Sequence, residues 1–138
     1  MTTILICGGR SYGVDFTPRR EPPEVRAAGR ELARKQRWVM ERTLNGLFLE
    51  FGPFRLVEGG APGADACAQA WAYKNRSEHK QHKADWKRHG KAAGPIRNAQ
   101  MLAMEQPDLV IAFPGGKGTA SMVGLARAAG VEVREIKA

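Results

Sequence analysis

The sequence predicts an α/β protein with a Rossmann-like, doubly wound, mostly parallel five-stranded sheet and helices on both faces. Short apolar segments alternate along the chain with longer segments of helical periodicity. Three of the apolar segments also run directly into glycine-rich turns. Such alternation is typical of strand–helix–strand units, whose right-handed crossovers connect parallel strands and cover both faces of the sheet. A chain of 138 residues is expected to form one domain, residues 1–138.

The first third of the chain is expected to hold one strand and one helix around a long loop. Thr3–Cys7 is β-branched and apolar and stops at Gly8-Gly9, as a buried strand entering a tight turn does. Val14–Gly29 holds three prolines and no apolar periodicity, so we expect a Pro-rich loop insertion there. Helical periodicity begins at Arg30, with Leu32, Met40, Leu44, Leu47 and Phe48 on one face, and it ends at Gly52-Pro53.

The rest of the chain continues the alternation. The expected strands are Phe54–Val57, His79–Ala84, Asp108–Phe113 and Val131–Ile136. The expected helices are Asp65–Asn75, Pro95–Met104 and Ala120–Ala129, the last closed by Gly130. The segment Asp108–Phe113 is the clearest strand, whereas the side chains of His79–Ala84 are mostly polar.

Composition and charge limit the classes of protein that remain. The sequence has no apolar run long enough for a membrane span and no signal-peptide pattern at its start. Its two cysteines, Cys7 and Cys67, cannot form a disulfide framework, so we expect a cytoplasmic protein without membrane partners. His79 and His82 have no cluster of further ligands nearby, and no metal site is expected.

The positive charge is concentrated in one part of the chain. The formal net charge is +8, and the stretch Lys74–Arg97 contributes eight basic residues against two acidic ones. Such a stretch favours a polyanion or a phosphorylated small ligand. A solubilising surface is the alternative interpretation.

Three glycine turns are the candidate site. They are Gly8-Gly9-Arg10, Gly59-Gly60-Ala-Pro-Gly63-Ala64-Asp65 and Pro114-Gly115-Gly116-Lys117-Gly118-Thr119. In a parallel sheet these turns meet outside the carboxyl ends of the strands, where open α/β sheets bind their ligands. Glycine allows the backbone to approach an anion, and the helix that follows offers unpaired N–H groups. The turns therefore predict a phosphate-bearing ligand.

Two common nucleotide motifs are absent from these turns. A Walker A loop needs Ser or Thr after its lysine, but Gly118 follows Lys117. The dinucleotide fingerprint needs a third glycine where Ser121 stands. A P-loop ATPase or a nicotinamide dehydrogenase is therefore not expected, nor is a resident cofactor.

The motifs together resemble the YspA-type branch of the SLOG superfamily. The resemblance is carried by the three glycine turns, by Ala84-Asp-Trp-Lys-Arg-His-Gly-Lys-Ala-Ala-Gly-Pro-Ile-Arg-Asn98, and by the strand Pro107–Phe113. It implies a Rossmann-like nucleotide-binding domain of bacteria and their phages, without fixing a reaction. The chain departs from the family at Ser11, where Asp is usual, and in the longer Val14–Gly29 stretch.

A relative in the same superfamily is the cytokinin-activating phosphoribohydrolase, with the motif Pro-Gly-Gly-x-Gly-Thr-x-x-Glu and an upstream arginine. Pro114–Thr119 matches the glycine part and Arg97 the arginine, but Met122 occupies the glutamate position. A thioether cannot ionise or accept a proton, so the carboxylate of the hydrolase is missing. If the chain is an enzyme, the candidate catalytic residues are Asp65, Asp85 and Arg97.

The candidate ligand site combines the turns with residues of the central motif. Its members are Gly8, Gly9, Arg10, Gly59, Gly60, Gly63, Ala64, Asp65, Asp85, Trp86, Arg97, Asn98, Pro114, Gly115, Gly116, Lys117, Gly118 and Thr119. Arg97, in the first helical turn after Pro95, is expected to bind phosphate. Asp65 is expected either to cap its helix or to contact a ribose. Trp86 is expected either in the core or as a stacking platform for a base, and Thr119 as a helix cap or phosphate ligand.

Three functions are compatible with these residues. The first is binding of a nucleotide or nucleotide-derived ligand, as a sensor or sequestering protein, in which Arg97 and Arg10 clamp the phosphate. The second is hydrolysis of the N-glycosidic bond of a nucleotide. The third is nucleic-acid binding, because the superfamily includes the single-strand DNA-binding protein of natural transformation. The sequence leaves homo-oligomerisation open.

Overall fold

The computed structural model describes all 138 residues and contains one five-stranded sheet in the order β3-β2-β1-β4-β5. The strands are β1 (Thr2–Cys7), β2 (Phe54–Glu58), β3 (Glu78–Gln81), β4 (Leu109–Ala112) and β5 (Glu132–Glu135). The helices are α1 (Pro23–Phe51), α2 (Ala64–Lys74), α3 (Trp86–His89), α4 (Ala93–Glu105) and α5 (Lys117–Ala128), and a 3-10 turn covers Gly90–Ala92. Every neighbouring pair of strands is parallel, which confirms the Rossmann-like α/β prediction.

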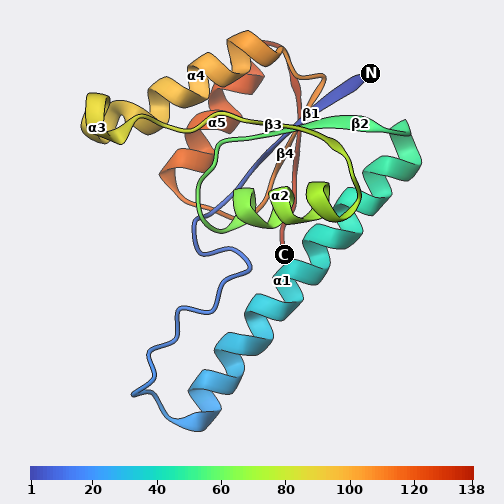
Figure 1. Cartoon of the computed structure of the whole chain (residues 1–138). Coiled ribbons are helices and arrows are strands. Elements are labelled where there is room, and N and C mark those ends of the chain that lie inside the picture. The colour runs from blue at the N-terminus through green and yellow to red at the C-terminus, as the bar shows by residue number, and fades with distance from the viewer.

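The sheet separates two layers of helices (Figure 1). Side chains alternate along a strand, so Ile4 and Ile6 of β1 face one side and Leu5 and Cys7 face the other. The first pair packs in a core cluster with residues of α1 and α2, whereas the second pair packs with residues of α4 and α5. No helix in the chain is both long enough and apolar enough to cross a lipid bilayer.

Helix α1 begins earlier than the sequence indicated. The stretch Val14–Gly29 was expected to be a loop, but the helix starts at Pro23. Proline is favourable in the first turn of a helix because its missing N–H has no helical partner there. The N-terminal half of α1 extends beyond the sheet (Figure 1). Because this half does not lie against the sheet, its sequence does not need the apolar periodicity that identifies a buried helix face. Leu32, expected on one face with the apolar residues Met40 and Leu44, is exposed because it lies in this half of the helix, and Phe48 is exposed as well.

Other elements also differ from expectation. The polar strand β3 ends at Gln81 rather than Ala84. The short helix α3 was not predicted; the Asp85 carboxylate caps it by accepting a hydrogen bond from the backbone N–H of Arg88 at 3.0 Å. Helix α5 begins at Lys117, three residues before the expected Ala120, because Gly116 is its N-cap.

The three glycine turns are bonded to one another at the carboxyl edge of the sheet. The backbone N–H of Gly9 donates to the carbonyl oxygen of Pro114 at 2.9 Å, and the N–H of Ala64 donates to the carbonyl oxygen of Gly9 at 3.0 Å. Gly63 has a φ of 80°, and a Cβ there would collide with the Gly9 carbonyl. Only glycine fits this close approach, which fixes the second turn against the first.

Candidate functional site

A cavity of about 520 Å³ opens where the glycine turns meet. Residues from all three turns and from α3, α4 and α5 line it. The expected site residues among them are Gly8, Gly9, Arg10, Gly59, Asp65, Trp86, Arg97, Asn98, Gly116, Lys117, Gly118 and Thr119. The structure therefore brings together most of the residues that the sequence singled out.

Six expected residues do not line this cavity. They are Gly60, Gly63, Ala64, Asp85, Pro114 and Gly115. Gly63 and Ala64 join the turns, as described above, and Asp85 caps α3 at the surface. Pro114 and Gly115 line a neighbouring cavity instead. The structure thus removes Asp85 from the set of carboxylates that face the cavity.

Arg97 connects the second glycine turn to α4. Its guanidinium donates to the carbonyl oxygen of Gly59, and its Nε donates to Oδ1 of Asn98 at 2.9 Å. Arg97 is the fifth residue of α4 and lies in the second turn of the helix, not the first as expected. Burial lowers the pKa of Arg97, and Asp65 opposes this effect. Arg97 makes no ion pair with a carboxylate, so its charge is available at the cavity wall.

Arg10 is the second cation at the cavity. Its Cζ lies 5.0 Å from the centroid of the Trp86 ring, in a cation–π contact. It forms no salt bridge either. Trp86 is 48% exposed, so the prediction of a core position is wrong and its ring is a wall of the cavity.

Asp65 holds the second glycine turn in place. It is the second residue of α2, whose N-cap is Gly63, so the expected capping role is wrong. Its Oδ2 instead accepts hydrogen bonds from the backbone N–H groups of Gly59 at 3.2 Å and Ala61 at 3.1 Å. Burial raises the pKa of Asp65 to about 7, although these hydrogen bonds act in the opposite direction. The carboxyl therefore changes charge near neutral pH.

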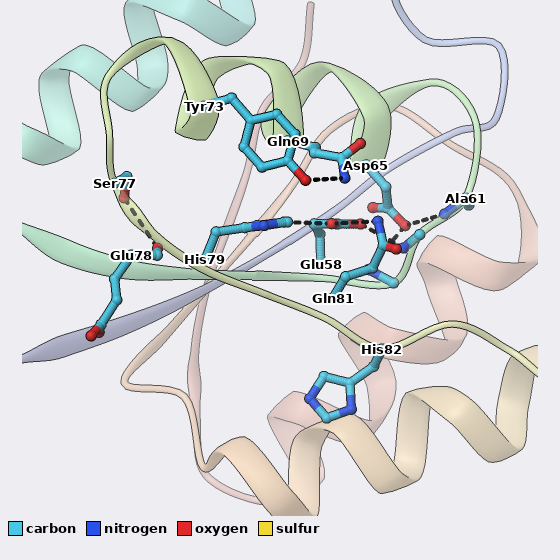
Figure 2. Close-up of polar contacts among 12 residues, drawn as sticks. Glu58, Ala61, Asp65, Gln69, Tyr73, Ser77, Glu78, His79, Gln81 and His82 are labelled. Atoms are coloured by element: carbon cyan, nitrogen blue, oxygen red, sulfur yellow. Dashed lines mark hydrogen bonds and ion pairs between the residues drawn. The ribbon is translucent and has the colours of Figure 1, made fainter.

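Glu58, which was not predicted from the sequence, is a second buried carboxylate that contacts the second glycine turn. Glu58 is fully buried at the end of β2 and accepts hydrogen bonds from Gly60 N–H at 2.5 Å and Gln81 Nε2 at 2.9 Å. Its Oε2 lies 2.6 Å from His79 Nε2 (Figure 2). His79 and Gln81, the two half-buried residues of β3, are thus partners of Glu58, which explains why the inward side of that strand is polar.

The third turn brings the N-terminus of α5 to the cavity. Gly116 is the N-cap of α5, and nothing lies within 4 Å of the place where its Cβ would be. Thr119 is the third residue of α5 and makes no side-chain cap, contrary to one of its two expected roles. The unpaired N–H groups of the first turn of α5 and the positive end of its dipole suit an anion.

The floor of the cavity is apolar. Cys7, Met101 and Met122 line this floor, and all three are buried. None of them was among the expected site residues. Burial raises the pKa of Cys7 to about 12, so this thiol is not a nucleophile at neutral pH. The alternation of β1 could have shown that Cys7 faces the same side as α4 and α5.

The basic stretch Lys74–Arg97 does not converge on the cavity as a whole. Arg97 and Lys91 line it. The side chains of Lys80, Lys83, Lys87 and Arg88 are exposed along β3 and α3. Most of the stretch therefore forms a solvated surface beside the site.

A larger cavity of about 760 Å³ lies at the opposite, amino edge of the sheet. Its side-chain charges are one arginine and one glutamate, Arg76 and Glu78, and its other lining residues include exposed Phe48 and Leu49. It has one cation without an ion pair, Arg76, whereas the smaller cavity has both Arg10 and Arg97, and no helix N-terminus lines it. The cations and the helix N-terminus therefore make the smaller cavity the better candidate site for an anionic ligand.

The fold and the cavity define a Rossmann-like α/β protein whose glycine turns face a cationic hollow at the carboxyl edge of the sheet. Residues 2–89 match the YspA, cpYpsA-related SLOG family, and the chain belongs to that family. Membership points to a nucleotide-related function.

Two individual proteins are similar to this chain. The Gene 61 protein of Mycobacterium phage D29 is 41% identical in an alignment of 85 residues, which covers 56% of this chain and 67% of the phage protein. The X-ray structure of TM1055, a structural-genomics target, superposes with a TM-score of 0.62 at 17% identity. That superposition covers 96% of this chain and 72% of TM1055. At this identity it supports the fold alone.

Proposed function

We propose that the protein binds a nucleotide or nucleotide-derived phosphorylated ligand in the 520 Å³ cavity, as a sensor or sequestering protein. The observation that carries the proposal is the pair Arg10 and Arg97. Both line the cavity, and neither makes an ion pair with a carboxylate. Two such cations beside the N-terminus of α5 form a positive hollow that an anion neutralises.

The lining suggests an orientation for the ligand. A phosphate fits at Gly116–Gly118, where backbone N–H groups are open and the Arg97 cation is near. A base fits toward Trp86, whose exposed ring offers an aromatic face. The apolar floor at Met101 and Met122 excludes water beneath the ligand.

The same lining argues for binding without turnover. Hydrolysis of an N-glycosidic bond develops positive charge on the sugar, which a nearby carboxylate stabilises. Met122 offers none at the matching position, and Asp85 is on the surface. Asp65 is the carboxyl that lines the cavity, and its pKa of about 7 supports hydrolysis as a second candidate function.

Calorimetry with AMP and with adenosine tests the proposal. We expect AMP to bind and adenosine to bind much more weakly, because only AMP carries the phosphate. Native mass spectrometry of the purified protein is expected to show a co-purified phosphorylated small molecule. Failure of a panel of nucleoside mono- and diphosphates to bind at millimolar concentration would overturn the proposal.

Nucleic-acid binding remains the alternative for the exposed basic surface along β3 and α3. It predicts that affinity for single-stranded DNA falls steeply with salt and depends on Lys83 and Lys87. The nucleotide proposal instead predicts that Lys83→Ala and Lys87→Ala leave AMP affinity unchanged, because neither residue lines the cavity.

A further inference from the structure

A second cavity, of about 640 Å³, adjoins the first and shares Gly9, Arg10 and Gly116 with it. Its other lining residues include Tyr12, Phe16 and Gln36. Gln36 belongs to α1, which covers one face of the sheet, whereas the first cavity is lined from α4 and α5 on the other face. The two cavities therefore lie on opposite sides of the sheet and join over its carboxyl edge.

The topology explains why the cavities join at this place. The chain leaves β1 toward α1 on one face, and it leaves the neighbouring strand β4 toward α5 on the other face. Open α/β sheets bind extended ligands at such a reversal. Here the two turns contact each other through the hydrogen bond from Gly9 N–H to the Pro114 carbonyl, so they form a ridge between the two cavities. Two of the three shared residues are glycines, so Arg10 has the one long side chain among the residues that the two cavities share.

The second cavity has a lining suited to a ring rather than to another phosphate. Phe16 is 65% exposed, whereas Tyr12 is buried, with its ring 5.2 Å from that of Phe113. Arg10, on the shared ridge, is its one charged residue. Gln36 is fixed because its Oε1 accepts a hydrogen bond from Gly13 N–H at 2.8 Å. The exposed aromatic ring of Phe16, without further cations beside it, suits a base or another flat ring.

We propose that the ligand has two ends: two ring-bearing groups joined through a central diphosphate. One ring lies against Trp86 in the first cavity, the diphosphate crosses the ridge at Gly9, Arg10 and Gly116, and the second ring lies against Phe16. This inference rests on the proposed function, since it assumes that the anion binds at the N-terminus of α5. It adds that a mononucleotide occupies the first cavity and leaves the second cavity empty.

Calorimetry with AMP and with diadenosine diphosphate tests the inference, because the second compound is two AMP units sharing a pyrophosphate. We expect diadenosine diphosphate to bind about tenfold more tightly or better, as a second stacked base contributes. Phe16→Ala is expected to remove this advantage while leaving AMP affinity unchanged. Leu32→Ala is the matched control, because Leu32 is a similarly exposed apolar residue outside both cavities.

The possible outcomes separate the two proposals. Equal affinity for AMP and diadenosine diphosphate overturns the two-ended ligand and leaves the proposed function standing. A tenfold advantage that survives Phe16→Ala also overturns it, because the second ring then lies elsewhere. Failure of both compounds to bind removes the proposed function and this inference together.

Discussion

The guanidinium of Arg10 lies over the ring of Trp86, with 5.0 Å between Cζ and the ring centroid. Arg10 follows β1 and Trp86 begins α3, so their contact connects two elements at the mouth of the cavity. The contact occupies the aromatic face that the proposed base needs. Binding therefore requires Arg10 to leave the ring or to lie on the opposite side of the base, and its charge is then free to contact phosphate.

The first prediction concerns Trp86. Trp86→Ala is expected to weaken nucleotide binding by about 1–3 kcal/mol, the usual contribution of one base–aromatic stack. Trp86→Phe keeps an aromatic ring and is expected to retain most of the affinity. Calorimetry on both variants measures the difference. If Trp86→Ala bound AMP as tightly as the unmodified protein, the base would have to lie elsewhere in the cavity.

The second prediction concerns the N-cap of α5. Gly116→Asp is expected to abolish phosphate binding, because a carboxylate would occupy the place of the anion and repel it. The fold is expected to survive, since nothing lies within 4 Å of the new Cβ and Asp is a favourable N-cap residue. Gly46→Asp, which also points into open space but lies on α1, is the control. Undiminished affinity in folded Gly116→Asp would remove this turn from the site.

The third prediction separates binding from hydrolysis. Arg97→Ala is expected to weaken AMP binding sharply, whereas Arg97→Lys keeps the charge and retains part of the affinity. Chromatography of nucleoside monophosphates incubated with the unmodified protein is expected to show negligible free base. A missing electrostatic group typically lowers a rate by a factor of about 10²–10³. Base release at enzymatic rates that Asp65→Asn abolishes, and Asp85→Asn does not, would establish the hydrolase instead.

The fourth prediction concerns the segment Val14–Pro22 before α1. It carries exposed Arg19 and Arg20, and its Phe16 lines the second cavity. Such a segment is placed to cover a bound ligand as a lid. Limited trypsin digestion is expected to cut at Arg19 or Arg20, and saturating ligand is expected to slow that cut. Cleavage at Lys137, near the C-terminus, serves as the internal control, and equal protection at both places would count against a lid.

The fifth prediction is a dependence of stability on pH through Asp65. Its pKa is about 7 in the folded protein against 3.8 for an ordinary Asp. Between these two pKa values the folded state holds a proton that the unfolded state has lost. The free energy of unfolding therefore falls as pH rises toward 7, by an amount on the order of a few kcal/mol, and this contribution is fully lost above pH 7.

Asp65→Asn is the variant that isolates this effect. Its amide oxygen can still accept from Gly59 and Ala61, but it does not titrate. Urea unfolding at several pH values from 4.5 to 8 is expected to show the variant gaining stability relative to the unmodified protein as pH rises. A constant difference across that range would contradict the raised pKa.

The sequence predicted the strands and their glycine turns because both signals are local. A strand buried on both faces is a continuous apolar run, as in Asp108–Phe113, and a close backbone approach requires glycine whatever the rest of the chain does. Parallel strands then place their turns at one edge. This is why nine of the twelve proposed site residues that line the cavity belong to the three glycine turns.

The features that the sequence did not predict depend on contacts between distant segments. Asp65 at the start of a helix has the pattern of a cap, but the bend of the preceding turn brings Gly59 and Ala61 to its carboxylate. The burial of Glu58 follows from its pairing with β3, and no local pattern distinguishes it from a surface glutamate. The early start of α1 was not predicted for a different reason. The part of the helix that extends past the sheet has no face to bury, so its sequence lacks the apolar periodicity on which the prediction relied.

The backbone of Gly9 has a consequence for how the protein moves. Its N–H forms a hydrogen bond to the turn after β4, and its carbonyl accepts one from the turn before α2. Neither of these two turns can therefore open without breaking its hydrogen bond to the turn that contains Gly9. Amide hydrogen exchange should therefore show Gly9 and Ala64 exchanging through one shared opening, at a rate close to that of the central strands. The cradle for the anion would then be rigid before any ligand arrives, and adaptation to different ligands would fall to the chain between Ser11 and Pro22.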